Sequence, residues 1–301
     1  MKPADGARAD PLSLLDATLT RRAHARASSG YDAAAVLQAQ VREELLARLA
    51  LTPLKPATVL DVGAGTARSS LALKKRYPKA QVLALDSALP MLRLARRGFT
   101  LMRRFGRVCA DAARLPLPDE SVDLVFCNLM LQWSSPGPVL RELRRVLRSG
   151  GLLALSSCGP DSLQELRAAW AQADELPHVL PFLDMHDLGD AMVHAGFSAP
   201  VLDVDRYTLT YPGVREALAD LRANGSCNPL EQRRRTLTGR ERFASMREHF
   251  DQRRVDGRIA LTFEIVFAHG WAAARPAPAG SGEIRIRLDQ LQRRPPGRRP
   301  E

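Results

Sequence analysis

The 301-residue chain has no long apolar run and few cysteines. No window reaches the roughly 18 apolar residues that a membrane-spanning helix needs, and no apolar stretch precedes Leu12, so we expect neither a transmembrane helix nor a signal peptide. No C-x-x-C pair occurs among the four cysteines, Cys109, Cys127, Cys158 and Cys227. This spacing indicates neither a disulfide framework nor a zinc finger, and we expect a cytoplasmic protein.

Lysine is scarce, although the chain is strongly basic. The 44 Lys and Arg residues outnumber the 33 Asp and Glu residues, which gives a formal net charge of +11. Such a charge is typical of proteins that bind nucleic acid or another acidic partner. The arginines are spread along the whole chain, however, and the dense clusters at 233–235 and 293–299 are interpreted as solvated segments. We therefore expect no nucleic-acid partner and no membrane association.

The chain does have a run of β-branched and apolar residues that ends in an acid and two alternate glycines, Thr58-Val59-Leu60-Asp61-Val62-Gly63-Ala64-Gly65. This pattern predicts a buried strand that breaks into a tight turn against a ligand. A Cβ atom would keep the backbone away from that ligand, which explains the glycines. Residues 67–77 are strong helix formers, so the turn would present backbone N–H groups at a helix start.

Charge around this turn indicates the kind of ligand. A dinucleotide would place an anionic pyrophosphate here, and Asp61, two residues before Gly63, would repel it. The third glycine of the G-x-G-x-x-G pattern is also missing, because its position holds Arg68. A carboxylate suits a ligand with positive charge, such as S-adenosylmethionine with its ammonium and sulfonium groups. A purely structural turn is the alternative interpretation.

A second acid follows the next predicted strand. Residues 81–85 are apolar and β-prone, and they end at Asp86. This carboxylate lies about 20 residues beyond the glycine turn, the distance at which a βαβ unit brings an acid to a ribose diol. Asp86 is therefore the second predicted binding residue.

The D-x-G-x-G motif at 61–65 resembles the first motif of the class I, seven-stranded methyltransferases. The resemblance implies an α/β, Rossmann-like sheet of seven strands with an N-terminal helical lid and helical cap insertions, and S-adenosylmethionine as the cofactor. The Asp111-Ala112 pair resembles the adenine-binding motif of the same proteins, where the acid accepts from the exocyclic amine and the next backbone N–H meets the ring. Asp111 as an acid of a turn and Met91 as simple core are the alternatives. The cofactor-binding residues implied in this way are Asp61, Gly63, Ala64, Gly65, Asp86, Ser87, Met91, Asp111, Ala112, Asn128 and Leu129.

A further strand is predicted at 121–128. The carboxyl ends of parallel strands are where an open α/β sheet binds ligands, so Asn128 and Leu129 should face the transferred methyl group. Enzymes that methylate base amino groups usually have an acid or Asn followed by Pro-Pro-Tyr here, whereas this chain has Leu129-Met130-Leu131. This difference argues against methylation of base nitrogens.

A narrower resemblance covers most of residues 20–270 and is to the malonyl-acyl-carrier-protein O-methyltransferases of biotin synthesis. Its most specific blocks are Asn-Leu-x-Leu-Gln-Trp at 128–133 and Ser-Leu-x-Glu-Leu at 162–166, because generic cofactor binding does not require them. The resemblance implies methylation of a free malonyl carboxylate on an acidic carrier protein, with Gln132 and Trp133 on the substrate side. A methyltransferase acting on another small acceptor, such as a quinone precursor, and a hydroxylase-like relative are the alternatives.

The segment before the core contains the motif Arg26-Ala27-Ser28-Ser29-Gly30-Tyr31-Asp32. The resemblance implies that it forms a lid over the cofactor, with Tyr31 as a candidate catalytic residue. A helix cap by Asp32, with Tyr31 packing beside it, is the alternative. Residues 32–50 predict an amphipathic helix whose apolar face carries Val36, Leu37, Val41, Leu45 and Leu49.

Four parts of the chain are expected: an N-terminal segment with the lid helix at 1–50, the cofactor-binding core at 51–160, cap helices with the last two strands at 161–271, and a Pro/Arg-rich tail at 272–301. In this reading, helices span 140–147, 162–174, 187–195, 213–224 and 238–250, and strands span 152–156, 202–209 and 257–268. His186, Asp190 and His194 share one helix face. A third, distant ligand is missing from the pattern, so we expect no metal site.

Overall fold

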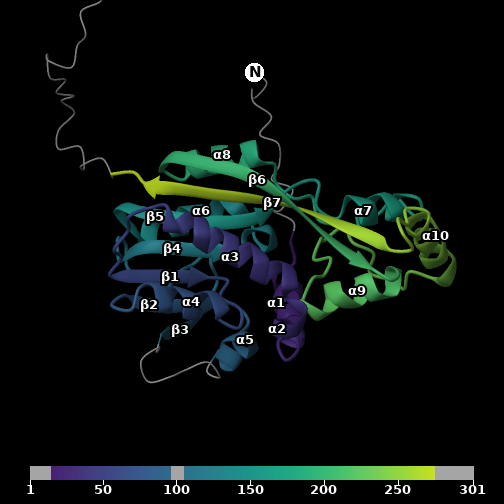
Figure 1. The fold of residues 1–301 in the computed structure, drawn as a ribbon, viewed down its shortest axis with the longest axis horizontal. Coiled ribbons are helices and arrows are strands. Elements are labelled where there is room, and N and C mark those ends of the chain that lie inside the picture. Colours follow the sequence, from purple (N-terminus) through teal and green to yellow (C-terminus); the bar gives the residue numbers. More distant parts are fainter. Residues whose placement is uncertain (1–14, 96–104, 275–301) are drawn as a thin grey trace, which may run out of the picture.

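The computed structural model describes residues 15–95 and 105–274, so most of the tail predicted at 272–301 lies outside the described part. Seven strands form one sheet in the order β3-β2-β1-β4-β5-β7-β6 (Figure 1). The strands are β1 Thr58–Val62, β2 Gln81–Asp86, β3 Gly106–Cys109, β4 Val122–Asn128, β5 Leu147–Cys158, β6 Phe197–Tyr211 and β7 Ile259–Ala272. β1 to β5 pair in parallel, and β7 lies antiparallel between β5 and β6. The predicted seven-stranded α/β sheet is confirmed.

The order of the strands reverses next to β1. From β1 the chain builds outward through β2 and β3, and it then returns to add β4 on the other side of β1. In an open parallel sheet, a reversal of this kind opens a crevice beyond the carboxyl ends of the two strands. The glycine turn after β1 and the segment after β4 both lie at this place in the fold.

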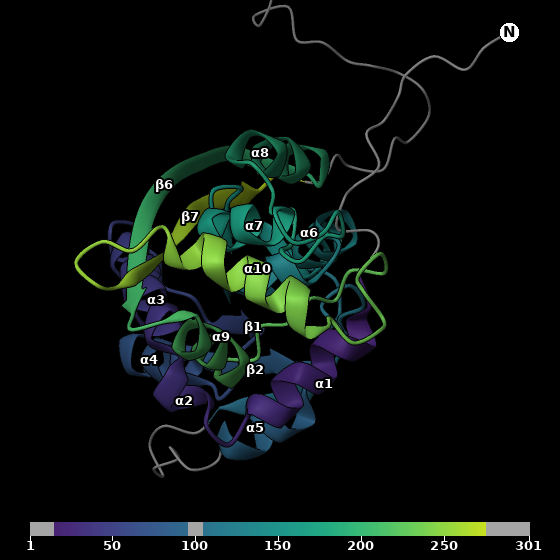
Figure 2. The ribbon, with the colours of Figure 1, turned by 90° about the vertical axis from the view of Figure 1, so that its right-hand side faces the viewer.

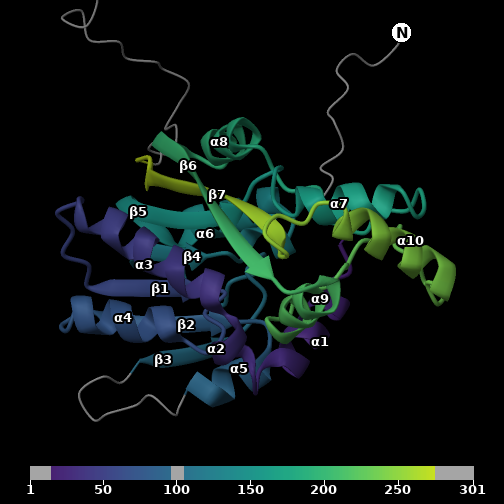
Figure 3. The same ribbon diagram turned by 45° about the vertical axis from the view of Figure 1, so that its right-hand side comes forward.

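The helices cover the two faces of the sheet and the carboxyl ends of its parallel strands. α3 and α4 pack on one face and α6 and α8 on the other (Figure 3), while α7, α9 and α10, which we call the cap, lie together beyond the parallel strands (Figure 2). No helix within 15–95 and 105–274 is long and apolar enough to cross a bilayer. The helices are α1 Ala17–Ala27, α2 Tyr31–Ala34, α3 Val36–Ala50, α4 Arg68–Arg76, α5 Leu89–Leu94, the 3-10 turn η2 Leu131–Trp133, α6 Pro136–Val146, α7 Gln164–Ala171, α8 Met185–His194, α9 Val214–Ala223 and α10 Arg240–Asp251.

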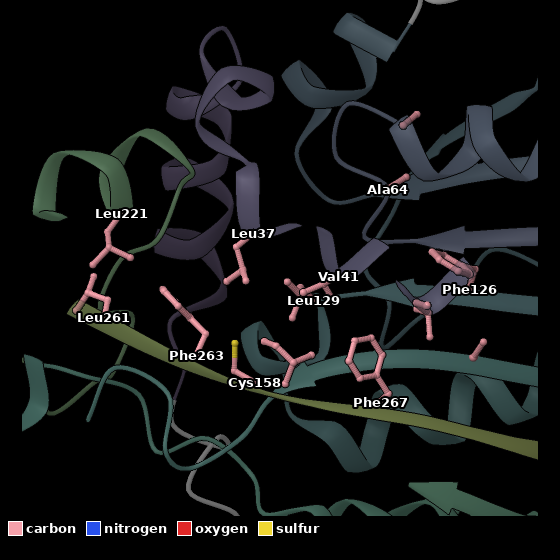
Figure 4. Close-up of a cluster of buried hydrophobic side chains, with 14 of the residues drawn as sticks. Leu37, Val41, Ala64, Phe126, Leu129, Cys158, Leu221, Leu261, Phe263 and Phe267 are labelled. Atoms are coloured by element: carbon pink, nitrogen blue, oxygen red, sulfur yellow. The ribbon is translucent and has the colours of Figure 1, made fainter. Parts of the chain in front are cut away.

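One apolar cluster joins the sheet to the cap. Phe126 of β4 is fully buried, as are Leu261 and Ile265 of β7, and the cluster continues to Leu221 of α9 and Phe250 of α10. In Figure 4 the labelled side chains of Phe267, Phe263 and Leu261 follow the long β7 strand to Leu221 of the cap. Burial of each large apolar side chain contributes about 1.5–3 kcal/mol to stability. The cap is therefore anchored by the same core as the sheet.

The predicted helix at 32–50 is interrupted at Ala35, which separates α2 from α3. Leu37, Val41, Leu45 and Leu49 are buried as predicted. The prediction for Val36 is wrong, since its side chain is 52% exposed. Successive residues of a helix differ by about 100° in direction, so a neighbour of Leu37 points away from the buried stripe.

Several predicted boundaries also shift. α6 begins at Pro136, before the predicted start at 140, because proline fits the first turn of a helix. The helix ends at Val146, and Leu147 already pairs with Val122 as the start of β5. A Cβ on Gly151 would lie 3.1 Å from the Asp123 carbonyl oxygen, so glycine here allows two backbones to approach closely. Strands β6 and β7 are both longer than predicted.

α1 was not predicted as a helix. Only Thr20 is buried in it, so the helix has almost no apolar stripe for periodicity analysis to detect. The Asp16 side chain caps α1 by accepting from the backbone N–H of Leu19 at 2.9 Å. The backbone N–H of Asp16 donates to the carbonyl of Pro229 at 2.8 Å, and Leu15 bridges to Leu230. These contacts attach the N-terminal segment to the loop between α9 and α10.

Replacing Val41 by Ala should lower the free energy of unfolding by about 2 kcal/mol, because two fully buried methyl groups are lost. Val36→Ala is the matched control in the same helix, and we expect it to stay within about 0.5 kcal/mol of the parent because the side chain is half exposed. Urea denaturation of both variants measures the difference. Equal losses would contradict the assignment of the buried face of α3.

Candidate cofactor and acceptor site

In the glycine turn after β1, side chains of neighbouring segments come close to the backbone. Gly63 has φ +70°, and a Cβ added there would lie 2.4 Å from the Cβ of Met130. Gly65 has φ +54°, and its added Cβ would lie 3.9 Å from a ring carbon of Tyr31. Any larger residue at 63 would push the segment after β4 away, so this glycine brings the two strand ends together.

Asp86 joins the ends of β1 and β2. Its Oδ2 accepts from the backbone N–H of Gly65 at 2.8 Å, and its Oδ1 accepts from that of Ala88 at 2.7 Å. Burial raises the pKa of Asp86, while these backbone hydrogen bonds and the charge of His24 act in the opposite direction without cancelling it. Each carboxylate oxygen has a further lone pair, so Asp86 can accept two more hydrogen bonds, as a vicinal diol would require.

Asp61 lies behind the turn. It is 1% exposed, and its Oδ2 accepts from the hydroxyl of Ser70 in α4. Burial raises the pKa of Asp61 to about 7, although the Ser70 hydrogen bond lowers it. In this position the carboxylate fixes α4 to β1 and does not line the cavity described next.

A cavity of about 560 Å³ opens at the carboxyl ends of the parallel strands. This is the size of a site for a cofactor-sized ligand. Of the residues predicted from the sequence, Asp61 and Ala64 are not among those lining it. The predicted residues that do line it are Tyr31, Gly63, Gly65, Asp86, Ser87, Met91, Asp111, Ala112, Asn128, Leu129, Gln132 and Trp133.

The segment predicted to form a lid is tied to the core by Asp32. Its Oδ1 accepts from the Thr66 hydroxyl at 2.5 Å, and its Oδ2 accepts from Arg68 Nη2 at 2.6 Å. The carboxylate therefore ties α2 to the start of α4 and does not cap its own helix. Next to it, burial raises the pKa of Tyr31, with the negative charge of Asp86 acting in the same direction, so the phenol remains neutral.

Hydrogen bonds hold the segment after β4. Asn128 Nδ2 donates to the Gln38 carbonyl at 3.1 Å, and Asn128 Oδ1 accepts from the Ser156 hydroxyl at 3.1 Å. Leu129 follows in the left-handed region at φ +51°, where a non-glycine residue costs about 1–3 kcal/mol. The Gln132 amide donates to the Leu129 carbonyl at 2.9 Å. The hydrogen bonds of Asn128 and Gln132 thus offset the strain at Leu129 and hold residues 128–132 at the cavity wall.

Asp111 forms a local turn at the cavity wall, where its Oδ1 accepts from the backbone N–H of Ala113 at 2.9 Å. The turn interpretation and the predicted adenine contact are compatible, because the other carboxylate oxygen is not used by this bond. At the other end of the cavity Trp133 meets His24 edge to face, with ring centroids 5.3 Å apart.

The lining residues that were not predicted include His24, Gln38, Trp170 and His178. The Nδ1 of His24 donates to the Thr20 carbonyl at 2.9 Å, because a carbonyl can only accept. The rings of Trp170 and His178 stack at 3.8 Å, and His178 Nε2 bonds Asp174 at 2.8 Å. None of these residues belongs to a motif with fixed spacing, so only the fold brings them to the site.

The predicted helix with His186, Asp190 and His194 is α8. His186 bonds Asp184, the cap of this helix, and His194 bonds the backbone carbonyl of Asp190. Among the residues described by the structure, no three His, Cys, Asp or Glu side chains are grouped as metal ligands.

Comparisons with known proteins agree with this architecture. The methyltransferase domain family matches residues 60–155. The malonyl-[acyl-carrier protein] O-methyltransferase of Xylella fastidiosa (strain M23) is 47% identical over 262 residues, which cover 86% of this chain and 89% of that protein. The protein of the same name from Methylovorus sp. (strain MP688) is 44% identical over 283 residues, which cover 91% of this chain and 96% of the relative. The chain belongs to the malonyl-[acyl-carrier protein] O-methyltransferase family.

Solved structures resemble this methyltransferase in fold. The YcgJ protein from Bacillus subtilis aligns with a TM-score of 0.54 and 15% identity over 77% of this chain and 99% of its own. A putative methyltransferase from Bacillus halodurans C-125 aligns with a TM-score of 0.54 and 19% identity over 77% of this chain and 100% of its own. At these identities the comparison supports the class I fold alone.

The cavity of the methyltransferase fits S-adenosylmethionine, the cofactor of this family. The buried Oε1 of Gln38, a lining residue, has no hydrogen-bond partner within the described residues, and an unpartnered acceptor suits an ammonium donor. Asp86 suits ribose hydroxyls, and the sulfur of buried Met91 suits an aromatic ring. The two acceptors and the Met91 sulfur thus suit the ammonium group, the ribose and the adenine ring of the cofactor.

Asp86→Asn should weaken binding of S-adenosylhomocysteine by about 1–3 kcal/mol, because a neutral amide accepts more weakly and its NH2 opposes the N–H of Gly65 or Ala88. The Ala variant is less suitable, since it would leave two turn N–H groups without their acceptor. Calorimetric titration gives the affinity, and exposed Asp190→Asn is the control. An Asp86→Asn affinity equal to that of the control would exclude the ribose role.

Asp61→Asn should remove a pH dependence of stability. The folded-state pKa of about 7 lies above the value of about 4 in an unfolded chain, so the folded protein binds more protons between these values. The stability that this group contributes is therefore lost as pH rises toward 7. The free energy of unfolding is measured by urea denaturation at about pH 5 and about pH 8. Relative to the parent, the variant should be more stable at the higher pH than at the lower one. If the free energy of unfolding differs between variant and parent by the same amount at both pH values, Asp61 is not a buried, proton-binding group.

Proposed function

We propose that the protein transfers a methyl group from S-adenosylmethionine to the free carboxylate of a malonyl group on an acyl-carrier protein and forms the methyl ester. The observation that carries the proposal is that one cavity is lined both by the strand ends and by the cap. On the cap side it is lined by Leu166 and Trp170 of α7 and by Leu218 and Leu221 of α9. The match to the relatives of that name spans core and cap alike.

The cofactor side is assigned to the strand ends. Asp86 and Ser87 would hold the ribose, and Asp111 with the N–H of Ala112 would hold the adenine, beside Met91. The turn at Gly63 and Gly65 leaves space for the rest of the cofactor. When bound, S-adenosylmethionine supplies an electrophilic methyl group on its sulfonium.

The acceptor side needs no general base. A carboxylate is already an anionic nucleophile, so the protein has to orient it and exclude water. Gln132 is held by its bond to the Leu129 carbonyl, and Trp133 is held against His24, so both present fixed surfaces to the acceptor. Tyr31 remains protonated and lies over Gly65, where its hydroxyl can donate to the acceptor carboxylate. We assign Tyr31 to closure and orientation.

The purified protein should transfer a labelled methyl group from S-adenosylmethionine to malonyl-carrier protein and give a base-labile ester. Free malonate should be a much poorer acceptor, because the carrier supplies remote binding energy that positions the carboxylate. Acetyl-carrier protein, which has no free carboxylate, is the matched negative substrate. Transfer to neither malonyl substrate, with normal binding of S-adenosylhomocysteine, would refute the proposed acceptor and favour a different small molecule.

A further inference from the structure

α1 is a basic helix without acidic residues. Arg21, Arg22 and Arg26 are all exposed, and the sequence of α1 contains neither Asp nor Glu. None of the three guanidinium groups forms a salt bridge within 15–95 and 105–274. Among the described residues, the one side-chain hydrogen bond of these arginines is from Arg26 Nε to the Arg22 carbonyl oxygen. α1 thus presents three positive charges that are not neutralised by the described residues.

Several arginines elsewhere in the described chain are paired, and two show how. Arg48 contacts the carboxylates of Asp203 and Asp205, the latter at 2.7 Å. Arg145 contacts Glu142 at 2.6 Å and Asp119 at 2.8 Å. The three arginines of α1 differ from Arg48 and Arg145 because they have no such carboxylate partner among the described residues.

The charged helix borders the cavity. Ala17, Thr20, Arg21 and His24 form one stripe of α1 that lines the cavity, so Arg22 and Arg26, one helical turn apart, lie outside that stripe. α9 contacts α1 and contributes a further exposed arginine, Arg222, to the cavity lining (Figures 1 and 3). Arg222 also has no ion pair among the described residues. Positive charge therefore flanks the cavity on two neighbouring helices.

α1 is held firmly in this place. Its first residues are fixed to the loop after α9 by the Asp16–Pro229 hydrogen bond. At its other end His24 packs on Trp133, and a Cβ on Gly225 would lie 2.9 Å from the His24 ring. The arginines are thus displayed from a fixed helix, which lowers the entropy lost when a partner binds.

We propose that α1, together with Arg222 of α9, is the docking surface for the acidic carrier protein that presents the malonyl group. The inference rests on the proposed function and adds the surface that the carrier uses. Guanidinium groups bind carboxylates through paired hydrogen bonds, and charge complementarity raises the rate of encounter. A carrier seated on α1 would hold its substrate arm beside the cavity walls that α1 and α9 form.

The test reverses charge on α1 outside the cavity lining. In Arg22→Glu/Arg26→Glu, kcat/KM for malonyl-carrier protein should fall by about 10- to 100-fold at low salt, and its salt dependence should weaken. Methylation of malonyl-pantetheine, which lacks the carrier, should be unchanged. Arg22→Gln/Arg26→Gln should give an intermediate loss, which separates charge from helix formation.

The matched control is Lys75→Glu/Lys79→Glu, which changes net charge equally. Both lysines are exposed, and neither lines the cavity: Lys75 lies in the last turn of α4 and Lys79 in the turn before β2, near the amino end of that strand. Fluorescence anisotropy of labelled holo carrier protein measures docking without turnover. An α1 variant that binds the carrier as well as the control does would overturn the docking surface, even if methyl transfer is observed. Weaker carrier binding by the α1 variant alone would support it, even if another acceptor is methylated.

Discussion

The carboxylate of Asp86 accepts hydrogen bonds from the backbone N–H groups of Gly65 and Ala88, and the site depends on this pair of bonds. They fix the turn after β1 against the turn after β2, so the two loops that line the cavity with predicted cofactor-binding residues are joined to each other. Asp61, buried behind the turn, fixes the next helix through Ser70. The two carboxylates thus have different roles. Asp61 only stabilises the scaffold, whereas Asp86 stabilises the scaffold and also faces the cavity.

The cap follows from the length of the last two strands. β6 and β7 extend beyond the parallel strands and carry apolar residues such as Leu261 to the place where α9 and α10 pack. A continuous cluster spans the sheet and the cap, which favours a rigid acceptor side and leaves closure to the short α2 segment with Tyr31.

The sequence was sufficient for the sheet and for the place of the cavity, and insufficient for the edges of the site. The glycines at 63 and 65 and the acid at 86 each have a physical explanation, so a seven-stranded α/β sheet with a cavity at the carboxyl ends of its parallel strands could be predicted. α1 could not, because its single buried residue leaves no periodic pattern. Asp61 was predicted from charge to face the ligand, but nothing in a sequence shows which side of a strand end a carboxylate occupies. His24 and Gln38 are brought to the cavity by tertiary contacts alone.

The contact between Asp16 and Pro229 has a consequence for the time at which the site is formed. The first helix of the described chain can be placed only after more than two hundred further residues have been synthesised, and closing a loop of that length is slow and entropically costly. The sheet from β1 to β5 can pair before that, whereas the wall formed by α1 must wait for α9. A ribosome-bound intermediate would therefore have the glycine turn without an enclosed cavity, so the newly made enzyme acquires its full ligand affinity only as its last strands are completed.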